Sequence, residues 1–147
     1  MLATNHNKLV AAIGSAVDPH APWITQIRQA VTAFVQTVDA NPAITLSRIR
    51  ELPTLGDGAG PGMRHRLTDL AELLVTLTSN PGFSQAGVSP ISRPAAVIVL
   101  GGLRELTAQT VEDLGDASAM IAPAVEVLTA VLRSGASPVN QDLPSRR

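Results

Sequence analysis

The chain of 147 residues has the length of one domain and is long enough to bury a hydrophobic core. Hydrophobic residues make up 45% of it and aromatic residues 2%, and its formal net charge is −1. Nucleic-acid surfaces need an excess of cations, often with aromatic rings for stacking, so this composition argues against one. The chain has no cysteine, which excludes disulfides, thiol catalysis and thiolate metal sites.

No hydrophobic stretch of the sequence reaches the roughly 18 residues that a transmembrane helix needs. The first residues also lack the basic and then apolar order of a signal peptide. We therefore expect a cytoplasmic protein without a membrane partner.

Helical periodicity dominates the first part of the chain, and no pair of strands with hairpin turn chemistry stands out. Apolar residues at helical spacing predict a helix over residues 7–17 and a longer one over about 22–40. Asn41-Pro42 is then expected to cap and open a short helix over 42–52.

The middle of the chain combines a glycine-rich segment with a leucine-rich one. Glycines alternate within residues 53–62, which predicts a flexible connection. Leucines at spacings of three and four predict a helix over about 63–78, followed by a polar loop that reaches Ser92.

The last two predicted helices are the most apolar. The first spans about 93–114 and is closed by Gly115. The second spans about 117–133, where Pro123 either kinks the helix or marks its true start. Residues 135–147 are expected to form a disordered tail.

The 93–114 helix is apolar over more of its circumference than the stripe of about 100° that a surface helix buries. It is therefore either the central helix of the core or a helix shared with a second copy of the chain. Gly101-Gly102 favours the second interpretation. Each glycine inside a helix costs about 1 kcal/mol relative to alanine, and the close approach of another backbone would explain the pair.

Four short sequence segments occur in a characteristic order and spacing. Residues 7–13 read NKLVAAI, Asn41-Pro42 follows a long amphipathic helix, Arg50-Glu51-Leu52 precedes Gly56, and residues 99–106 read VLGGLREL. Together they resemble the C-terminal domain of TetR-family transcriptional regulators. The resemblance covers about residues 8–132.

This resemblance implies an all-α bundle of about six helices over residues 1–134, in which the last two helices form a four-helix bundle with a second copy. It also implies a small-molecule effector. The family's N-terminal helix-turn-helix headpiece has no counterpart here, so we expect contact with DNA only through a headpiece absent from this chain.

The family analogy places a ligand pocket among the helices before the last pair, and the aliphatic composition predicts an apolar effector. For each candidate residue, plain core packing is the alternative. The candidate lining residues are Trp23, Phe34, Met63, Leu70, Leu74, Leu103 and Thr107. The residues expected at the dimer interface are Val99, Gly102, Leu106, Thr110, Ile121, Val125, Leu128 and Leu132.

Two charged residues, Arg104 and Glu105, interrupt the most apolar helix. Either Arg104 lies at the pocket or interface and pairs with an acidic partner, or the two residues form an exposed pair on the outer face. The sequence favours neither alternative.

No motif in the sequence predicts catalysis. Its serines lie outside any nucleophile-elbow context, and its alternating glycines do not follow a strand as those of a phosphate loop would. His65 and Asp69 share a helix face with Glu72, but a single imidazole beside two arginines is more typical of a solvated face than of a metal site. We expect no enzymatic activity, metal or cofactor.

The expected function is therefore that of the effector-binding and dimerisation part of a repressor-type regulator. The alternative is a free-standing helical protein, without DNA-binding activity, that pairs with other chains such as a full-length regulator.

Overall fold

The computed structural model describes residues 2–41, 43 and 59–136, and all regular structure among them is helical. The predicted all-α class is confirmed. Apart from residue 43, the short helix expected over 42–52 lies outside the described residues, as do residues 53–58 of the expected connection and the chain from residue 137. Residues 135 and 136, which were expected to belong to the tail, are instead the end of helix α7. The elements are α1 (Leu2–Ala16), α2 (Trp23–Ala40), α4 (Ala59–Leu77), α5 (Pro81–Ser84), α6 (Arg93–Leu114), the 3-10 helix η2 (Ser118–Met120) and α7 (Ile121–Ala136).

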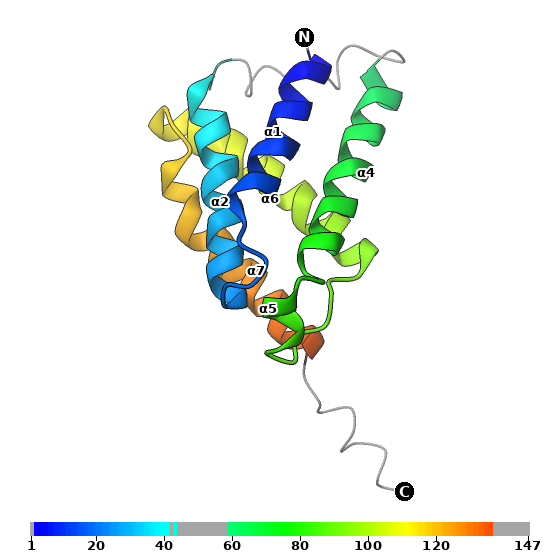
Figure 1. Ribbon diagram of the computed structural model, residues 1–147. Helices are drawn as coiled ribbons and strands as arrows, with labels where there is room; N and C mark the ends of the chain where they lie inside the picture. Colours follow the sequence, from blue (N-terminus) through cyan, green and yellow to red (C-terminus); the bar gives the residue numbers. More distant parts are fainter. Residues whose placement is uncertain (1, 42, 44–58, 137–147) are drawn as a thin grey trace, which may run out of the picture.

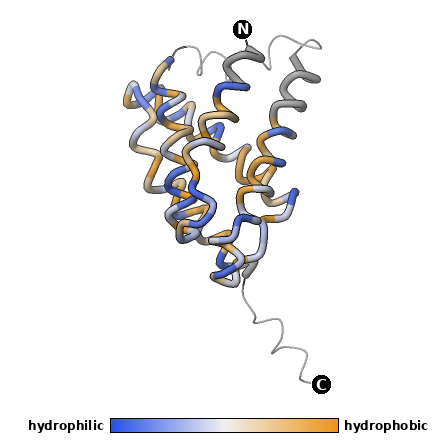
Figure 2. Tube along the Cα trace, in the orientation of Figure 1, coloured by the Kyte–Doolittle hydropathy of each residue, from blue (hydrophilic) through white to orange (hydrophobic). Residues whose placement is uncertain are grey.

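Helices α1, α2 and α4 lie side by side, and α6 and α7 cross behind them (Figure 1). The closest helix pairs are α1 with α2, α2 with α7, and α4 with α6. Apolar and polar segments alternate along α2 in Figure 2, which is the pattern of a helix with one face in the core. The fold is thus two crossing layers with aliphatic side chains between them.

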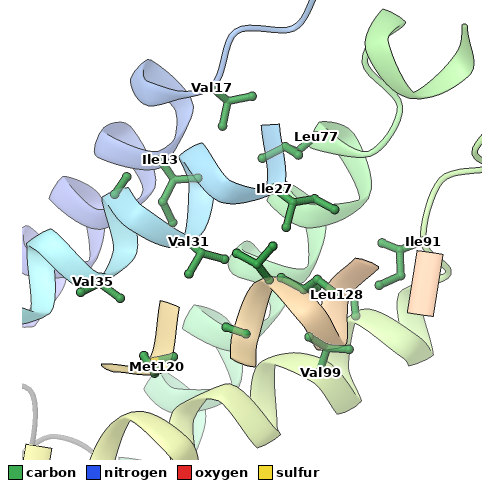
Figure 3. Packing of buried hydrophobic residues seen from close by; sticks show 14 of the residues in the cluster. Ile13, Val17, Ile27, Val31, Val35, Leu77, Ile91, Val99, Met120 and Leu128 are labelled. Carbon is green, nitrogen blue, oxygen red and sulfur yellow. The ribbon is translucent and has the colours of Figure 1, made fainter. Parts of the chain in front are cut away.

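The core draws on every long helix. Ile13 from α1, Val31 from α2 and Leu77 from α4 gather with Val99 of α6 and Leu128 of α7 in Figure 3. All five side chains are buried. At about 25 cal/mol per Å² of apolar surface removed from water, their burial is the main contribution that holds the two layers together.

Two helices begin earlier than the sequence predicts. Helix α1 starts at Leu2 rather than at residue 7, and α4 starts at Ala59, within the glycine-rich segment expected to be a flexible connection. Pro61 then lies in the first turn of α4, where its missing N–H costs no intrahelical hydrogen bond. A short helix, α5, also interrupts the expected polar loop.

Helix α6 has the predicted bounds, 93–114, and identifiable caps. The side chain of Ser92 accepts a hydrogen bond from the Ala95 N–H at 3.2 Å. At the other end, Gly115 takes a φ of 86°, and its N–H donates to the Val111 carbonyl. This left-handed backbone conformation is disfavoured for residues with a Cβ, which explains the glycine.

The start of α7 decides between the two alternatives for Pro123. The helix begins at Ile121, so the proline stands in its first turn and marks the true start. The preceding turn is closed by Asp116, whose carboxylate accepts hydrogen bonds from the Ser118 hydroxyl at 2.7 Å and from the Ser118 N–H at 3.0 Å. These two hydrogen bonds lower the pKa of the Asp116 carboxyl.

Candidate ligand-binding cavity

A cavity of about 100 Å³ lies where α1, α2, α4, α6 and α7 meet. Apart from one arginine and one thioether, the described residues around it contribute only hydrocarbon side chains. They are Ile13, Ala30, Val31, Phe34, Leu67, Leu70, Leu73, Leu74, Leu77, Leu100, Leu103, Arg104, Met120, Ala124 and Leu128. A space with such walls offers no hydrogen bonds to water, so it favours an apolar occupant.

The cavity follows from the way α4 packs. Five leucines at spacings of three and four form one stripe of this helix, and all five line the cavity. Helix α4 meets α6 over a long contact and α1 over a short one. Leu70, Leu73 and Leu74 therefore remain half-buried although they face inward, and the small side chains of Ala30 and Ala124 leave the space between the layers unfilled.

Four of the seven candidate ligand-binding residues line this cavity: Phe34, Leu70, Leu74 and Leu103. Thr107 is fully buried beside it, with its hydroxyl 2.6 Å from the Leu103 carbonyl and 3.1 Å from the Met120 sulfur. The side chain of Met63 lies outside the described part of the structure.

Trp23 lies elsewhere. Its ring packs against Phe83 at 6.0 Å between centroids, and the Arg133 guanidinium lies 5.9 Å from the ring centre. The Trp23 ring at the start of α2 therefore packs against α5 and contacts the end of α7. It does not line the cavity.

The structure also brings residues to the cavity that the sequence did not single out. Ile13 of α1, Ala124 of α7 and Met120 are examples, and Leu128 lines the cavity although it was expected at a dimer interface. Helical periodicity places these residues on apolar stripes, but it does not predict which stripes line a cavity and which pack in the filled core. The only signal for Arg104 was its position inside the most apolar helix.

Most residues expected at a dimer interface pack inside the chain instead. Five of the eight are buried in the protein's own core: Val99, Thr110, Val125, Leu128 and Leu132. Leu106 and Ile121 are half-buried, and Gly102 is exposed. Because α6 is apolar on several faces, the stripe chosen from the sequence is the one that faces inward.

The outer face of α6 changes character along the helix. Its first half exposes Val97, Ile98 and the Gly101-Gly102 pair, and 75% of Ile98 is accessible to solvent. Its second half exposes charged and polar residues, among them Glu105 and Gln109. On α7, Val127 is 50% exposed. Leu114 is exposed as well, at the very end of α6. The large exposed apolar side chains of the last two helices are thus Val97, Ile98, Leu114 and Val127.

Arg104 and Glu105 have separate environments. Arg104 is half-buried and lines the cavity, whereas Glu105 is exposed and accepts a hydrogen bond from Gln109 at 3.0 Å. The other arginine of α6, Arg93, donates to Glu72 on α4 at the surface. Such exposed ion pairs contribute little to stability.

Among the described side chains, no three histidine, aspartate or glutamate residues come together as metal ligands do. His65 lies outside those side chains, and Glu72 pairs with Arg93. None of the described helices has both the length and the hydropathy of a membrane span.

No family model, curated protein or solved structure matches the chain.

Proposed function

We propose that the chain is the effector-binding and dimerisation domain of a TetR-like transcriptional regulator, and that it senses a small apolar molecule. The cavity between the two helical layers is the observation that carries the sensing role, because its walls are almost wholly hydrocarbon. The family assignment rests on the resemblance over residues 8–132. The proposal includes no enzymatic activity.

A ligand in the cavity would act on the arrangement of helices. It would touch Ile13 on α1 and, on the far side, leucines of α4 and α6. A ligand that fits one separation of these helices better than another shifts the population toward that separation. In the proposed regulator, α1 leads to the headpiece, so this shift would change how the headpiece meets DNA.

The exposed apolar positions of α6 and α7 support self-association as the second part of the proposal. Val97, Ile98 and Val127 are large apolar side chains that the chain leaves in solvent. A Cβ added at Gly101 or Gly102 would meet no other atom within 4 Å, so the fold of one chain does not require glycine at these positions. The close approach of a second backbone would explain the pair.

The alternative function is a free-standing helical protein that pairs with other chains. It shares the cavity and the exposed apolar positions, and it differs in lacking any attached headpiece. The encoded sequence upstream of Met1 discriminates between the two, since an in-frame helix-turn-helix supports the regulator and excludes the free-standing protein.

The cavity is tested with 1-hexanol as a neutral apolar probe and with two matched variants. A ligand present at ten times its Kd stabilises the fold by about 1.4 kcal/mol, which raises the Tm of a domain this size by about 4 °C. Ala124→Leu fills the cavity, whereas Ala122→Leu adds the same side chain at an exposed position of the same helix.

We expect 1-hexanol to raise the Tm of the unmodified chain and of Ala122→Leu, but not that of Ala124→Leu. An equal rise in both variants would contradict the proposal, because the alcohol would then bind outside the cavity. The absence of a rise in the unmodified chain would contradict it as well.

A further inference from the structure

The long helices form two groups, and the cavity lies between them. Helix α2 packs closely on both α1 and α7, and these three helices form one unit, whereas α4 packs closely on α6 and forms a second unit with it. Between the units, α1 meets α4 over a short contact. Ile13, Val31 and Leu128 line the cavity from the α1–α2–α7 unit, and leucines of α4 and α6 line it from the α4–α6 unit. The cavity is therefore a gap between two packed units.

Polar contacts join the two units near the start of α2. The Asn80 side chain, in the connection that follows α4, donates to the Gln26 side chain of α2 at 3.0 Å. In the same connection, the Gly82 N–H donates to the Pro19 carbonyl, also at 3.0 Å. These hydrogen bonds hold the connection between α4 and α6 to the first unit at this end of α2.

A second set of polar contacts lies near the end of α2. The Asp39 carboxylate of α2 accepts a hydrogen bond from the Ala117 N–H, in the turn after α6, at 2.7 Å. The 3-10 helix η2 follows this turn, and its Met120 sulfur lies 3.1 Å from the Thr107 hydroxyl of α6. The end of α6 is thus held to the end of α2.

Two fixed points define an axis, and here the axis runs along α2. At a rise of about 1.5 Å per residue, the step from Gln26 to Asp39 covers about 20 Å. Hydrogen bonds at these ends are directional and weaken steeply when they are bent, whereas the apolar contacts between the units have no preferred direction. A rotation of the α4–α6 unit about this axis therefore keeps the polar contacts and changes only the apolar ones.

The separation of α1 from α4 is the distance that such a rotation changes most. Figure 1 shows α1 between α2 and α4, so α4 lies on the side of α1 away from the axis. Leu70, Leu73 and Leu74 of α4 line the cavity and are half-buried, whereas Leu77, nearer the Gln26 contacts, is buried. Helix α4 is thus packed most tightly at the end where the units are joined.

We infer that the α4–α6 unit rotates as one body about an axis along α2, and that the occupant of the cavity sets the separation of α1 from α4. This inference rests on the proposed ligand-binding function. The cavity volume gives the direction of the movement. About 100 Å³ is less than the engineered cavity of about 150 Å³ that binds benzene, and 1-hexanol has more non-hydrogen atoms than benzene. A bound 1-hexanol molecule therefore requires α4 to move away from α1.

The inference is tested by double electron–electron resonance, which measures the distance between two spin labels, with and without 1-hexanol. The chain has no cysteine, so labels attach only to cysteines that are introduced in pairs. Ser15→Cys with Thr76→Cys reports the distance from α1 to α4. Two control pairs lie within a unit. Ser15→Cys with Gln36→Cys reports α1 to α2, and Thr76→Cys with Gln109→Cys reports α4 to α6. All of these positions are exposed.

We expect 1-hexanol to lengthen the mean α1–α4 distance by about 1 to 2 Å, the size of helix shifts in switching proteins. The α1–α2 and α4–α6 distances are expected to stay the same. In chains that also carry Ala124→Leu, which fills the cavity, the alcohol is expected to change none of the three distances. The labelled chains are diluted with unlabelled chain, so that only distances within one chain are measured.

The Tm of each labelled chain, measured with and without the alcohol, separates this inference from the proposed function. If 1-hexanol raises the Tm and leaves the α1–α4 distance unchanged, the inference is overturned and the binding function stands. If all three distances lengthen together, the fold expands as a whole, and the inference is overturned in the same way. If 1-hexanol does not raise the Tm, both are overturned.

Discussion

Gln26 joins the connection between α1 and α2 to the connection between α4 and α5. The residue is fully buried, and its amide nitrogen donates to the carbonyls of Pro19 at 3.0 Å and Ala21 at 2.9 Å. Its carbonyl oxygen accepts from the Asn80 side chain at 3.0 Å. The nitrogen and the oxygen of this buried amide therefore both have hydrogen-bond partners, as burial requires.

Gly82 completes the same contact. Its N–H donates to the Pro19 carbonyl at 3.0 Å, and the α1–α2 connection lies directly over its Cα. A Cβ at this position would overlap the Ala21 carbonyl oxygen and the Gln26 side chain. Because one of these atoms belongs to the backbone, the overlap is not relieved by a side-chain rotation.

Gly82→Ala is therefore expected to lower the free energy of unfolding by about 2 kcal/mol or more, as measured by urea denaturation. The control is Gly14→Ala in α1, where an added Cβ meets no atom within 4 Å. Alanine has the higher helix propensity, so this control is expected to raise the free energy of unfolding by about 0.5 to 1 kcal/mol. Equal effects of the two substitutions would contradict the packing described here.

The outer face of α6 is the feature of a single element that bears on assembly. Ile98 stands in the middle of its apolar first half, and Leu114 is exposed at the end of the same helix. At 3.6 residues per turn, the step of sixteen positions from Ile98 to Leu114 rotates the side chain by roughly 160° from that face. Leu114 therefore offers an exposed apolar control on the same helix, away from the proposed contact.

If two copies associate through this face, Ile98→Asp places a charge at the contact and is expected to raise the dimer dissociation constant at least about tenfold. Leu114→Asp is expected to leave it unchanged. Sedimentation equilibrium measures both constants against that of the unmodified chain. A chain that remains monomeric at every accessible concentration would refute the self-association proposal outright.

The elements show what periodicity predicts well and what it does not. The bounds of α6 and the end of α2 at Ala40 follow from proline, glycine and apolar spacing, which act locally. The inward face of α6 could not be chosen from the sequence, because Val99 and Ile98 are equally apolar neighbours. Whether each one is buried depends on where α4 and α7 lie.

The start of α4 illustrates a second limit. The sequence Gly60-Pro61-Gly62 is typical of a segment that breaks a helix. It is helical here because it lies in the first turn of α4, where proline is tolerated. Local propensity alone does not distinguish a turn before a helix from the first turn of that helix.

At the scale of the molecule, the cavity arises where five described helices meet without filling the space between them. The sequence predicted Phe34, Leu70, Leu74 and Leu103 as lining residues because they lie on apolar stripes. The sequence could not show that these residues line the cavity and that Trp23 does not, because the apolar spacing is the same on a helix face that packs in the filled core and on one that lines a cavity. That distinction depends on helix separation, which is a property of the packed layers.

The most direct test of the proposed binding function is to locate the bound probe by NMR. Amide shifts of the unmodified chain are followed while 1-hexanol is added. We expect saturable changes centred on the cavity walls, in residues 67–77 of α4 and 100–104 of α6, with small changes near Ile98. Changes centred on Ile98 and Val97, or changes that never saturate, would contradict the account, because the alcohol would then be binding the surface.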